Sequence, residues 1–138
     1  LLQTFYLDTS IWMDIRENRG GYEGEPLGDY GLKLLMNILA GGDSIAVSEL
    51  LFVKLQSKYS NDEITSLFAP FEKILNRIHI DRHQREWAQE LAMVRNVPRG
   101  DVLHAILARD NNLILVTRDR HFKLLDDIAR HFKPEELV

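Results

Sequence analysis

The feature that most constrains the fold is a short apolar run near the N-terminus that stops at a carboxylate. Residues 4–8 are predicted to form a strand, in which Thr, Phe, Tyr and Leu precede Asp8. Thr9 and Ser10 follow, and an apolar helical pattern begins at Ile11. A strand that ends in an aspartate and turns into a helix holds that carboxylate at the carboxyl edge of a sheet, where open α/β sheets bind ligands. We therefore expect Asp8 to be the first of several carboxylates around a divalent metal ion.

Strand-like and helix-like patterns alternate along the rest of the chain. Further strands are expected at 44–47, 77–80 and 113–116, with a last edge strand near 129–133. Helices are expected at about 10–17, 29–40, 49–59, 62–75 and 82–95, and from Asp101 to the Asp-Asn-Asn stop at 110–112. Because parallel strands are joined by helical crossovers, this alternation predicts a mostly parallel sheet with helices on both faces. We interpret residues 1–138 as a single α/β/α domain.

Small polar residues and glycines mark the expected ends of these helices. Thr9 or Ser10 is expected to cap the first helix, Ser48 the helix at 49–59 and Asn61 the helix at 62–75. The Gly- and Pro-rich segment at 18–28 is expected to be a surface loop, and Pro70 a bend.

The composition excludes several kinds of site and location. The 138 residues contain no cysteine, which excludes disulfides, thiolate zinc sites and cysteine nucleophiles, and fits a reducing, cytoplasmic location. No apolar run approaches the ~18–20 residues of a membrane span, so we expect no membrane association. A signal peptide is not expected either, and since the first residue is Leu1 rather than Met we expect the natural start to lie upstream.

The formal net charge of −4 disfavours a passive nucleic-acid binder, but it is compatible with an enzyme that reaches phosphates through a metal ion and a basic rim.

Three more acidic residues occupy positions equivalent to that of Asp8. Asp119 follows the clearest strand, Glu49 lies in the first helical turn after the second strand, and Asp101 opens a helix after a Pro-Arg-Gly turn. Strand ends and the first turns of the following helices share one edge of a parallel sheet, so the four carboxylates are expected to converge. Because clustered like charges raise one another's pKa, we expect a cation among them, and carboxylate oxygens suit Mg²⁺ or Mn²⁺. Phosphodiester hydrolysis is the reaction that uses such an ion most fully.

Each of these acids has a purely structural alternative. Asp8 and Asp119 can cap helices, while Glu49 and Asp101 can be ordinary acids of a first helical turn. The occurrence of all four at equivalent positions favours the functional interpretation.

Neighbouring polar residues are candidates for supporting roles. Thr9 and Thr117 are expected to orient the carboxylates, or to act only as cap and strand residues. Candidates for contacting substrate phosphates are Arg99, Arg118 and Arg120. Asp14 is expected to be exposed to solvent. We interpret His104, three positions after Asp101, as a partly buried or rim histidine rather than a zinc ligand.

The order and spacing of these motifs resemble the acidic motifs of PIN domains. The matching segments are Tyr-Leu-Asp-Thr-Ser at 6–10, Val-Ser-Glu-Leu at 47–50, Gly-Asp-Val-Leu-His-Ala at 100–105 and Val-Thr-Arg-Asp at 116–119. The resemblance covers essentially the whole chain. Within the family, the chain is similar to the small VapC-type ribonucleases of toxin–antitoxin modules.

This resemblance implies a three-layer α/β/α fold with a five-stranded parallel sheet. It also implies a Mg²⁺- or Mn²⁺-dependent endoribonuclease that cleaves single-stranded RNA and leaves a 5′-phosphate and a 3′-hydroxyl. By motif, Asp8, Glu49, Asp101 and Asp119 would form the catalytic and metal-binding site, with Thr117 supporting it. VapC-like members commonly form homodimers and are inhibited by an antitoxin protein that occupies a hydrophobic groove.

Two alternatives to a ribonuclease were weighed against the same residues. Haloacid-dehalogenase-like phosphatases also place Asp at the end of their first strand, but they require a second Asp two residues later, where this chain has Ser10. A catalytically weak or inactive PIN-like domain would bind RNA or protein without turnover, and the presence of all four acids argues against it.

Overall fold

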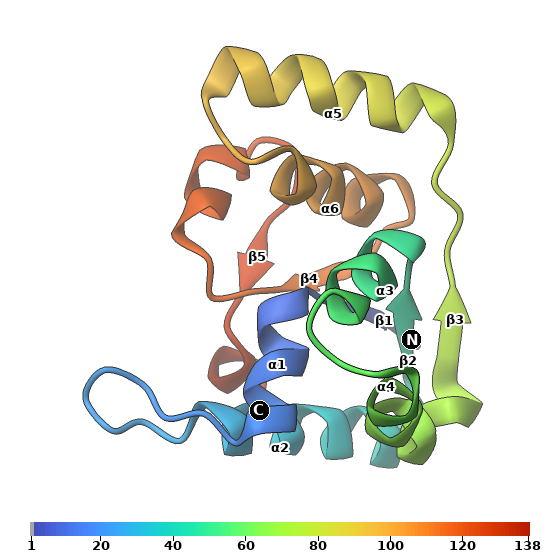
Figure 1. The fold of residues 1–138 in the computed structure, drawn as a ribbon, viewed down its shortest axis with the longest axis vertical. Helices are drawn as coiled ribbons and strands as arrows, with labels where there is room; N and C mark the ends of the chain where they lie inside the picture. Colours follow the sequence, from blue (N-terminus) through green and yellow to red (C-terminus); the bar gives the residue numbers. More distant parts are fainter. Residues whose placement is uncertain (1) are drawn as a thin grey trace.

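A five-stranded parallel sheet forms the centre of the protein. The structure is a computed structural model that describes residues 2–138. The strands are β1 (Thr4–Leu7), β2 (Ser44–Val47), β3 (Leu75–Arg77), β4 (Ile114–Val116) and β5 (His131–Phe132). They lie in the order β3-β2-β1-β4-β5, and all four neighbouring pairs are parallel (Figure 1). The predicted α/β/α class with a parallel sheet is therefore confirmed.

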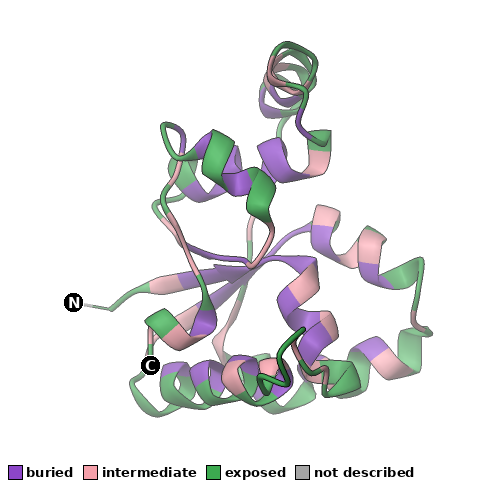
Figure 2. Ribbon diagram, turned by 90° about the vertical axis from the view of Figure 1, so that its left-hand side faces the viewer, coloured by how far each residue is buried: buried purple, intermediate pink, exposed green. Residues whose placement is uncertain are grey.

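Helices cover both faces of this sheet. They are α1 (Thr9–Glu17), α2 (Leu27–Ala40), α3 (Glu49–Gln56), α4 (Asn61–Phe68), α5 (Arg82–Arg95) and α6 (Arg99–Asp110). Three short 3₁₀ segments follow α4, β4 and β5, namely η1 (Ala69–Ile74), η2 (Arg120–Leu125) and η3 (Pro134–Glu136). Figure 2 shows the buried strands between the two helical layers, with α5 and α6 on one side. Among the described residues, no helix is both long and apolar enough to cross a membrane.

Side chains of β1, β2 and β4 alternate between two hydrophobic cores. Phe5 and Leu7 of β1 pack with Trp12 and with apolar residues of α2, α3 and α4, whereas Tyr6 packs on the opposite face with α6. Trp12 is fully buried, and its ring centroid lies 4.3 Å from that of Phe68. Because the side-chain period of a strand is two, a sheet covered on both faces needs continuous apolar runs, as the sequence has.

Two of the predicted helix caps are wrong by one or two residues. Asp8, not Thr9 or Ser10, caps α1, and its Oδ1 accepts a hydrogen bond from the Ile11 N–H at 3.4 Å. Ser60, not Asn61, caps α4. The reason for the second error is a reciprocal pair of hydrogen bonds between Ser60 and a glutamate three residues later, which satisfies two free N–H groups at once.

Several element boundaries also differ from the prediction. The helix expected at 62–75 ends at Phe68 and tightens into η1, where Pro70 lacks the N–H that an α-helix would use. The third strand covers Leu75–Arg77 instead of 77–80, so β3 begins directly after η1. The helix expected at 49–59 ends at Gln56, and the helix expected from residue 29 begins at Leu27.

Candidate active site

A cavity of about 350 Å³ lies at the carboxyl edge of the sheet, where β1 and β4 end. Its lining residues come from α1, α3, α6 and the strand ends; they are Asp8, Thr9, Ser10, Met13, Lys54, Ser57, Asp101, His104 and Asp119. We call it the acidic cavity. Three of the four carboxylates that the sequence predicts to converge, those of Asp8, Asp101 and Asp119, line it.

Asp8 is held in this cavity by hydrogen bonds from both of its flanks. Only 5% of the residue is exposed. The Ser10 hydroxyl donates to Oδ1 at 2.6 Å, and the Thr117 hydroxyl donates to Oδ2. Burial nevertheless raises the pKa of Asp8, and the charge of Asp119 raises it further. The hydrogen bonds fix the position of the carboxylate without neutralising it.

Asp101 stands in the first turn of α6 and faces the same space. It is 6% exposed, and its Oδ2 accepts no hydrogen bond from the described residues. Burial and the neighbouring charge of Asp119 raise the pKa of Asp101 to about 6, while the charge of Lys54 acts in the opposite direction. A buried carboxylate oxygen without a donor is costly unless a ligand completes its contacts.

Asp119 is linked to Asp101 through His121, a residue that the sequence interpretation missed. His121 Nδ1 lies 2.9 Å from Asp119 Oδ1 and 3.3 Å from Asp101 Oδ2. One potential ligand atom from each of these residues lies within 4.8 Å of the others, which suits a single bound ion. The only signal in the sequence is that His121 follows Asp119 by two positions, just past a strand end.

Glu49 does not join the other three acids, contrary to the expectation that all four converge. Its side chain is 72% exposed and lies 3.4 Å from an Arg85 nitrogen. The reason is the rotation of α3, which buries Leu51 and Leu55 and leaves Glu49 on the face shared with exposed Val53. The role of Glu49 as a metal ligand therefore stays a prediction.

Lys54, and not Glu49, is the charged side chain of α3 that lines the acidic cavity. It lines the acidic cavity together with Ser57, three residues later on the same face of the helix. The sequence interpretation missed Lys54. Helical spacing from the buried Leu51 and Leu55 is the signal that places Lys54 on the inner side of the helix.

The two predicted threonines both lie at the site. Thr117 donates to Asp8 and accepts the Asp119 backbone N–H at 3.1 Å, so it links the two strand ends. Thr9 is buried and lines the cavity, and its hydroxyl has no hydrogen-bond partner among the described residues.

The three predicted arginines have different surroundings. Arg118 donates to both oxygens of Glu135, at 2.6 and 2.9 Å, and its Nε lies 3.7 Å from Asp14. It points away from the acidic cavity. Asp14 is buried rather than exposed, which corrects the expectation for that residue. Arg99 lines a neighbouring cavity on α5 and α6, and Arg120 is exposed.

His104 is fully buried, deeper than the rim position expected from the sequence. Its Nδ1 lies 2.8 Å from the Tyr6 hydroxyl, which lies 2.6 Å from the Ser48 hydroxyl. Burial lowers the pKa of His104 to about 3, so the ring is neutral. This network fixes the floor of the acidic cavity from α6, β1 and the start of α3.

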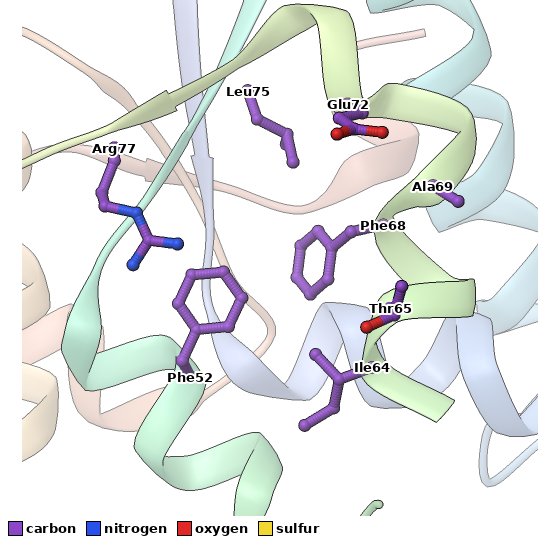
Figure 3. Close-up of a pocket in the computed structure, with 8 residues that line it drawn as sticks. All are labelled: Phe52, Ile64, Thr65, Phe68, Ala69, Glu72, Leu75 and Arg77. Atoms are coloured by element: carbon purple, nitrogen blue, oxygen red, sulfur yellow. The ribbon is translucent and has the colours of Figure 1, made fainter. Parts of the chain in front are cut away.

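A second cavity, of about 330 Å³, is apolar and lies beside the edge strand β3 (Figure 3). Phe52 of α3 and Phe68 of α4 pack against one another in its lining, with ring centroids 5.3 Å apart. The guanidinium of Arg77 lies over the Phe52 ring, 4.9 Å from its centroid. With Ile64 and Leu75 also in its lining, this hollow suits an apolar side chain better than an ion or a phosphate.

Known proteins share this fold and its sequence pattern. The sequence matches the PIN domain family over residues 5–128, and none of the curated protein sequences matches it. The structure of VapBC2 from Rickettsia felis bound to a DNA fragment from their promoter is similar with a TM-score of 0.67 and 22% identity, over 95% of this chain and 98% of that chain. PAE2754 from Pyrobaculum aerophilum is similar with a TM-score of 0.56 and 14% identity, over 99% of this chain and 95% of that chain. At these identities the two structures show a common fold, and the family match over most of the chain makes this protein a member of the PIN domain family.

Proposed function

We propose that this protein is a Mg²⁺- or Mn²⁺-dependent endoribonuclease and the toxin of a VapBC-type toxin–antitoxin module. PIN domains are in general nucleases, which sets the class of reaction. The observation that carries the proposal is the convergence of Asp8, Asp101 and Asp119 in one cavity. Among the described residues, no Lys or Arg nitrogen lies within the 4.0 Å of an ion pair from any of these three carboxylates. The cation that would pair with these carboxylates therefore has to be bound from solution.

The residues present fit a divalent ion with oxygen and nitrogen ligands. Asp101, Asp119 and His121 would hold it, because their ligand atoms are mutually within 4.8 Å and the buried Asp101 Oδ2 has no hydrogen-bond partner among the described residues. Asp8 would complete the site. When bound, such an ion lowers the pKa of a water molecule and offsets charge on the phosphoryl oxygens. Glu49 lies outside the cavity in this structure, and we keep it as a candidate that acts from the rim.

Neighbouring side chains hold the aspartates of the site in position, and one of them argues against a different reaction. Ser10 and Thr117 hold the two oxygens of Asp8 in place, and Thr117 also fixes the backbone of Asp119. We propose that water attacks the phosphorus of single-stranded RNA, the bond to the 3′ oxygen breaks, and the products carry a 5′-phosphate and a 3′-hydroxyl. Ser10 is engaged with Asp8 and is a poor proton donor, which argues against the phospho-aspartate chemistry of dehalogenase-like phosphatases.

The toxin role extends the proposal to partners. The Rickettsia felis structure contains VapBC2, and we infer that this chain is likewise paired with an antitoxin protein, forms a homodimer and acts in the cytoplasm. The apolar cavity in Figure 3 supports the antitoxin inference, because it offers Phe52 and Phe68 to an apolar side chain of a partner.

The test is cleavage of end-labelled single-stranded RNA by the purified protein with Mn²⁺, with Mg²⁺ and with EDTA. We expect cleavage only with the metal ion, and products with 5′-phosphates. Asp101→Asn should remove activity, whereas Asp62→Asn, at an exposed aspartate of α4, is the matched control and should retain it. Cleavage in EDTA, or equal activity of Asp101→Asn and wild type, would contradict the proposal.

A Mn²⁺ titration separates the nuclease from an inactive binding module. If the protein is a nuclease, we expect it to bind Mn²⁺. We expect Asp101→Asn to bind Mn²⁺ more weakly than wild type, and Asp62→Asn to bind it equally well. A module that serves only to bind RNA or protein has no need for metal at this cavity, so absence of Mn²⁺ binding would favour it.

A further inference from the structure

We propose that Lys54 binds a non-bridging oxygen of the substrate phosphate inside the acidic cavity. The inference rests on the proposed function, since it names a contact to the phosphodiester that is cleaved. Lys54 of α3 lines the cavity together with Asp8, Asp101 and Asp119.

Gly100 creates the space that the Lys54 ammonium occupies. A Cβ atom at position 100 would lie 2.6 Å from Lys54 Nζ, closer than side chains tolerate, and 3.1 Å from its Cε, a tight contact. The ammonium therefore rests against the first turn of α6, one residue before Asp101. This packing gives a long and flexible side chain a defined place at the site.

The charge of Lys54 is close to the carboxylates but is not engaged by any of them. Within the described part of the chain, the only lysine with a carboxylate oxygen inside 4.0 Å is Lys58, which pairs with Glu17 at 3.2 Å. Nevertheless, the Lys54 charge lowers the pKa of Asp101 and that of His104. The ammonium is thus available to a ligand that enters the cavity.

Charge balance indicates which ligand this is. Three carboxylates carry more negative charge than one divalent ion can offset, so a phosphodiester that enters the cavity would meet a net repulsion. A lysine ammonium is a compact point charge that binds phosphate oxygens well. Lys54 supplies additional positive charge in the wall of this cavity, beside Gly100 and outside ion-pairing distance of the three carboxylates.

The competing explanation is that Lys54 only offsets the charge of the carboxylates while no metal is bound. The two explanations differ in what they predict for RNA cleavage once the metal site is saturated. A lysine that only balances charge becomes dispensable once Mn²⁺ saturates the site, whereas a phosphate contact is needed most under that condition.

The experiment compares Lys54→Met, Lys54→Arg and Gly100→Ala with wild type in RNA cleavage at saturating Mn²⁺. We expect Lys54→Met to lower kcat/KM by about 10- to 100-fold, the range for loss of one charged hydrogen bond. Lys54→Arg should restore part of this loss. Gly100→Ala keeps the lysine but shifts its flexible end, so it should lower kcat/KM by less than Lys54→Met does. Lys58→Met is the matched control and should stay within about twofold of wild type.

Mn²⁺ affinity, measured by calorimetry on the same variants, provides the second readout. We expect Lys54→Met to bind Mn²⁺ as tightly as wild type or more tightly, because a nearby positive charge has been removed. The inference would be overturned if Lys54→Met kept the wild-type kcat/KM, or if its loss were explained entirely by weaker Mn²⁺ binding. The proposed function would stay intact in that case, provided that wild type is active and Asp101→Asn is inactive. If wild type does not cleave RNA, or Asp101→Asn cleaves as well as wild type, both proposals fall.

Discussion

Two groups of carboxylates in this protein have opposite electrostatic surroundings. At the far end of α1, Glu17 accepts a hydrogen bond from Tyr59 and contacts Arg19 and Lys58, which together lower the pKa of Glu17 to about 2. Burial raises the pKa of Glu135, but the hydrogen bonds from Arg118, a backbone hydrogen bond and the charges of Arg118 and Lys133 together outweigh burial and lower the pKa. We call the carboxylates of Glu17, Glu135 and Asp14 the ion-pair cluster. Burial raises the pKa of Asp14 as well, but Arg118 and Arg19 lie within ion-pairing distance of it and act in the opposite direction.

The acidic cavity shows the reverse arrangement. Burial raises the pKa of Asp8 and of Asp101, and neither has an arginine or lysine within ion-pairing distance among the described residues. Where carboxylates stabilise the fold, this chain places a cation beside them. Where it leaves them uncompensated, the missing charge has to come from a ligand, and that difference separates a structural cluster from a site.

The largest expected effect separates the two groups by activity. Asp8→Asn should lower RNA cleavage by about 1,000-fold or more, equivalent to about 4 kcal/mol, because it removes a charge from the metal site and disturbs the hydrogen bonds from Ser10 and Thr117. Glu135→Gln, at a carboxylate of the ion-pair cluster, should leave cleavage within about twofold. Comparable losses in both variants, measured by initial rates at saturating Mn²⁺, would mean that the two groups do not differ in function.

The next effect separates the same groups by stability. Arg118→Met should lower the free energy of unfolding by about 3 kcal/mol, because it leaves Glu135 and the buried Asp14 without their shared cation. Arg82→Met removes an exposed pair with Glu86 and should cost less than about 1 kcal/mol. Urea unfolding measures both values. If Arg118→Met unfolds at the wild-type urea concentration, the ion-pair cluster does not stabilise the fold.

The aspartates of the site were predictable because their positions follow from short stretches of sequence. Asp8 ends an apolar run, and Asp101 opens a helix after a Pro-Arg-Gly turn, so local patterns alone put both at one edge of a parallel sheet. The alternation of strand and helix patterns likewise predicted the α/β/α class. What remained uncertain was the length of β3 and of the helix before it, where Pro70 converts the end into a 3₁₀ segment.

Other site residues depend on how helices rotate, which local patterns specify less directly. Glu49 begins α3 as predicted, but the burial of Leu51 and Leu55 turns it outward and brings Lys54 to the cavity. His121 meets Asp101 only because η2 folds back beneath α6. Such residues are defined by contacts between segments that are distant along the chain, and a single sequence contains no direct signal for those contacts.

A smaller effect concerns the pH dependence of stability in the metal-free protein. The pKa of Asp101 is raised to about 6 in the folded state, so its contribution to stability is fully present below its ordinary value and is lost as pH rises through about 6. Asp101→Asn does not titrate. We therefore expect this variant to be more stable than wild type at pH 7.5 by about 1–2 kcal/mol, a value reduced because the side chain opens onto a solvated cavity.

This difference in stability should shrink as pH falls through about 6 and disappear below about 3.8, where Asp101 is protonated in both the folded and the unfolded wild type. Unfolding in urea with EDTA at several pH values measures it. Comparing the two proteins cancels the opposite contribution of His104, whose lowered pKa makes both less stable as pH falls below about 6.5. A difference that is independent of pH would show that Asp101 carries no unusual pKa.

The smallest expected effect concerns Glu49, which belongs to neither group of carboxylates. Within the described part of the chain, its only ion pair is an exposed one with Arg85 at 3.4 Å, and pairs of this kind contribute little. Glu49→Gln should therefore lower RNA cleavage by no more than about 10-fold, which corresponds to about 1.4 kcal/mol. Arg85→Met is its control, because it frees the same carboxylate without removing it. A loss as large as that of Asp8→Asn would mean that Glu49 turns into the acidic cavity when metal and RNA bind, and the sequence interpretation would then describe the working site better than the metal-free geometry does.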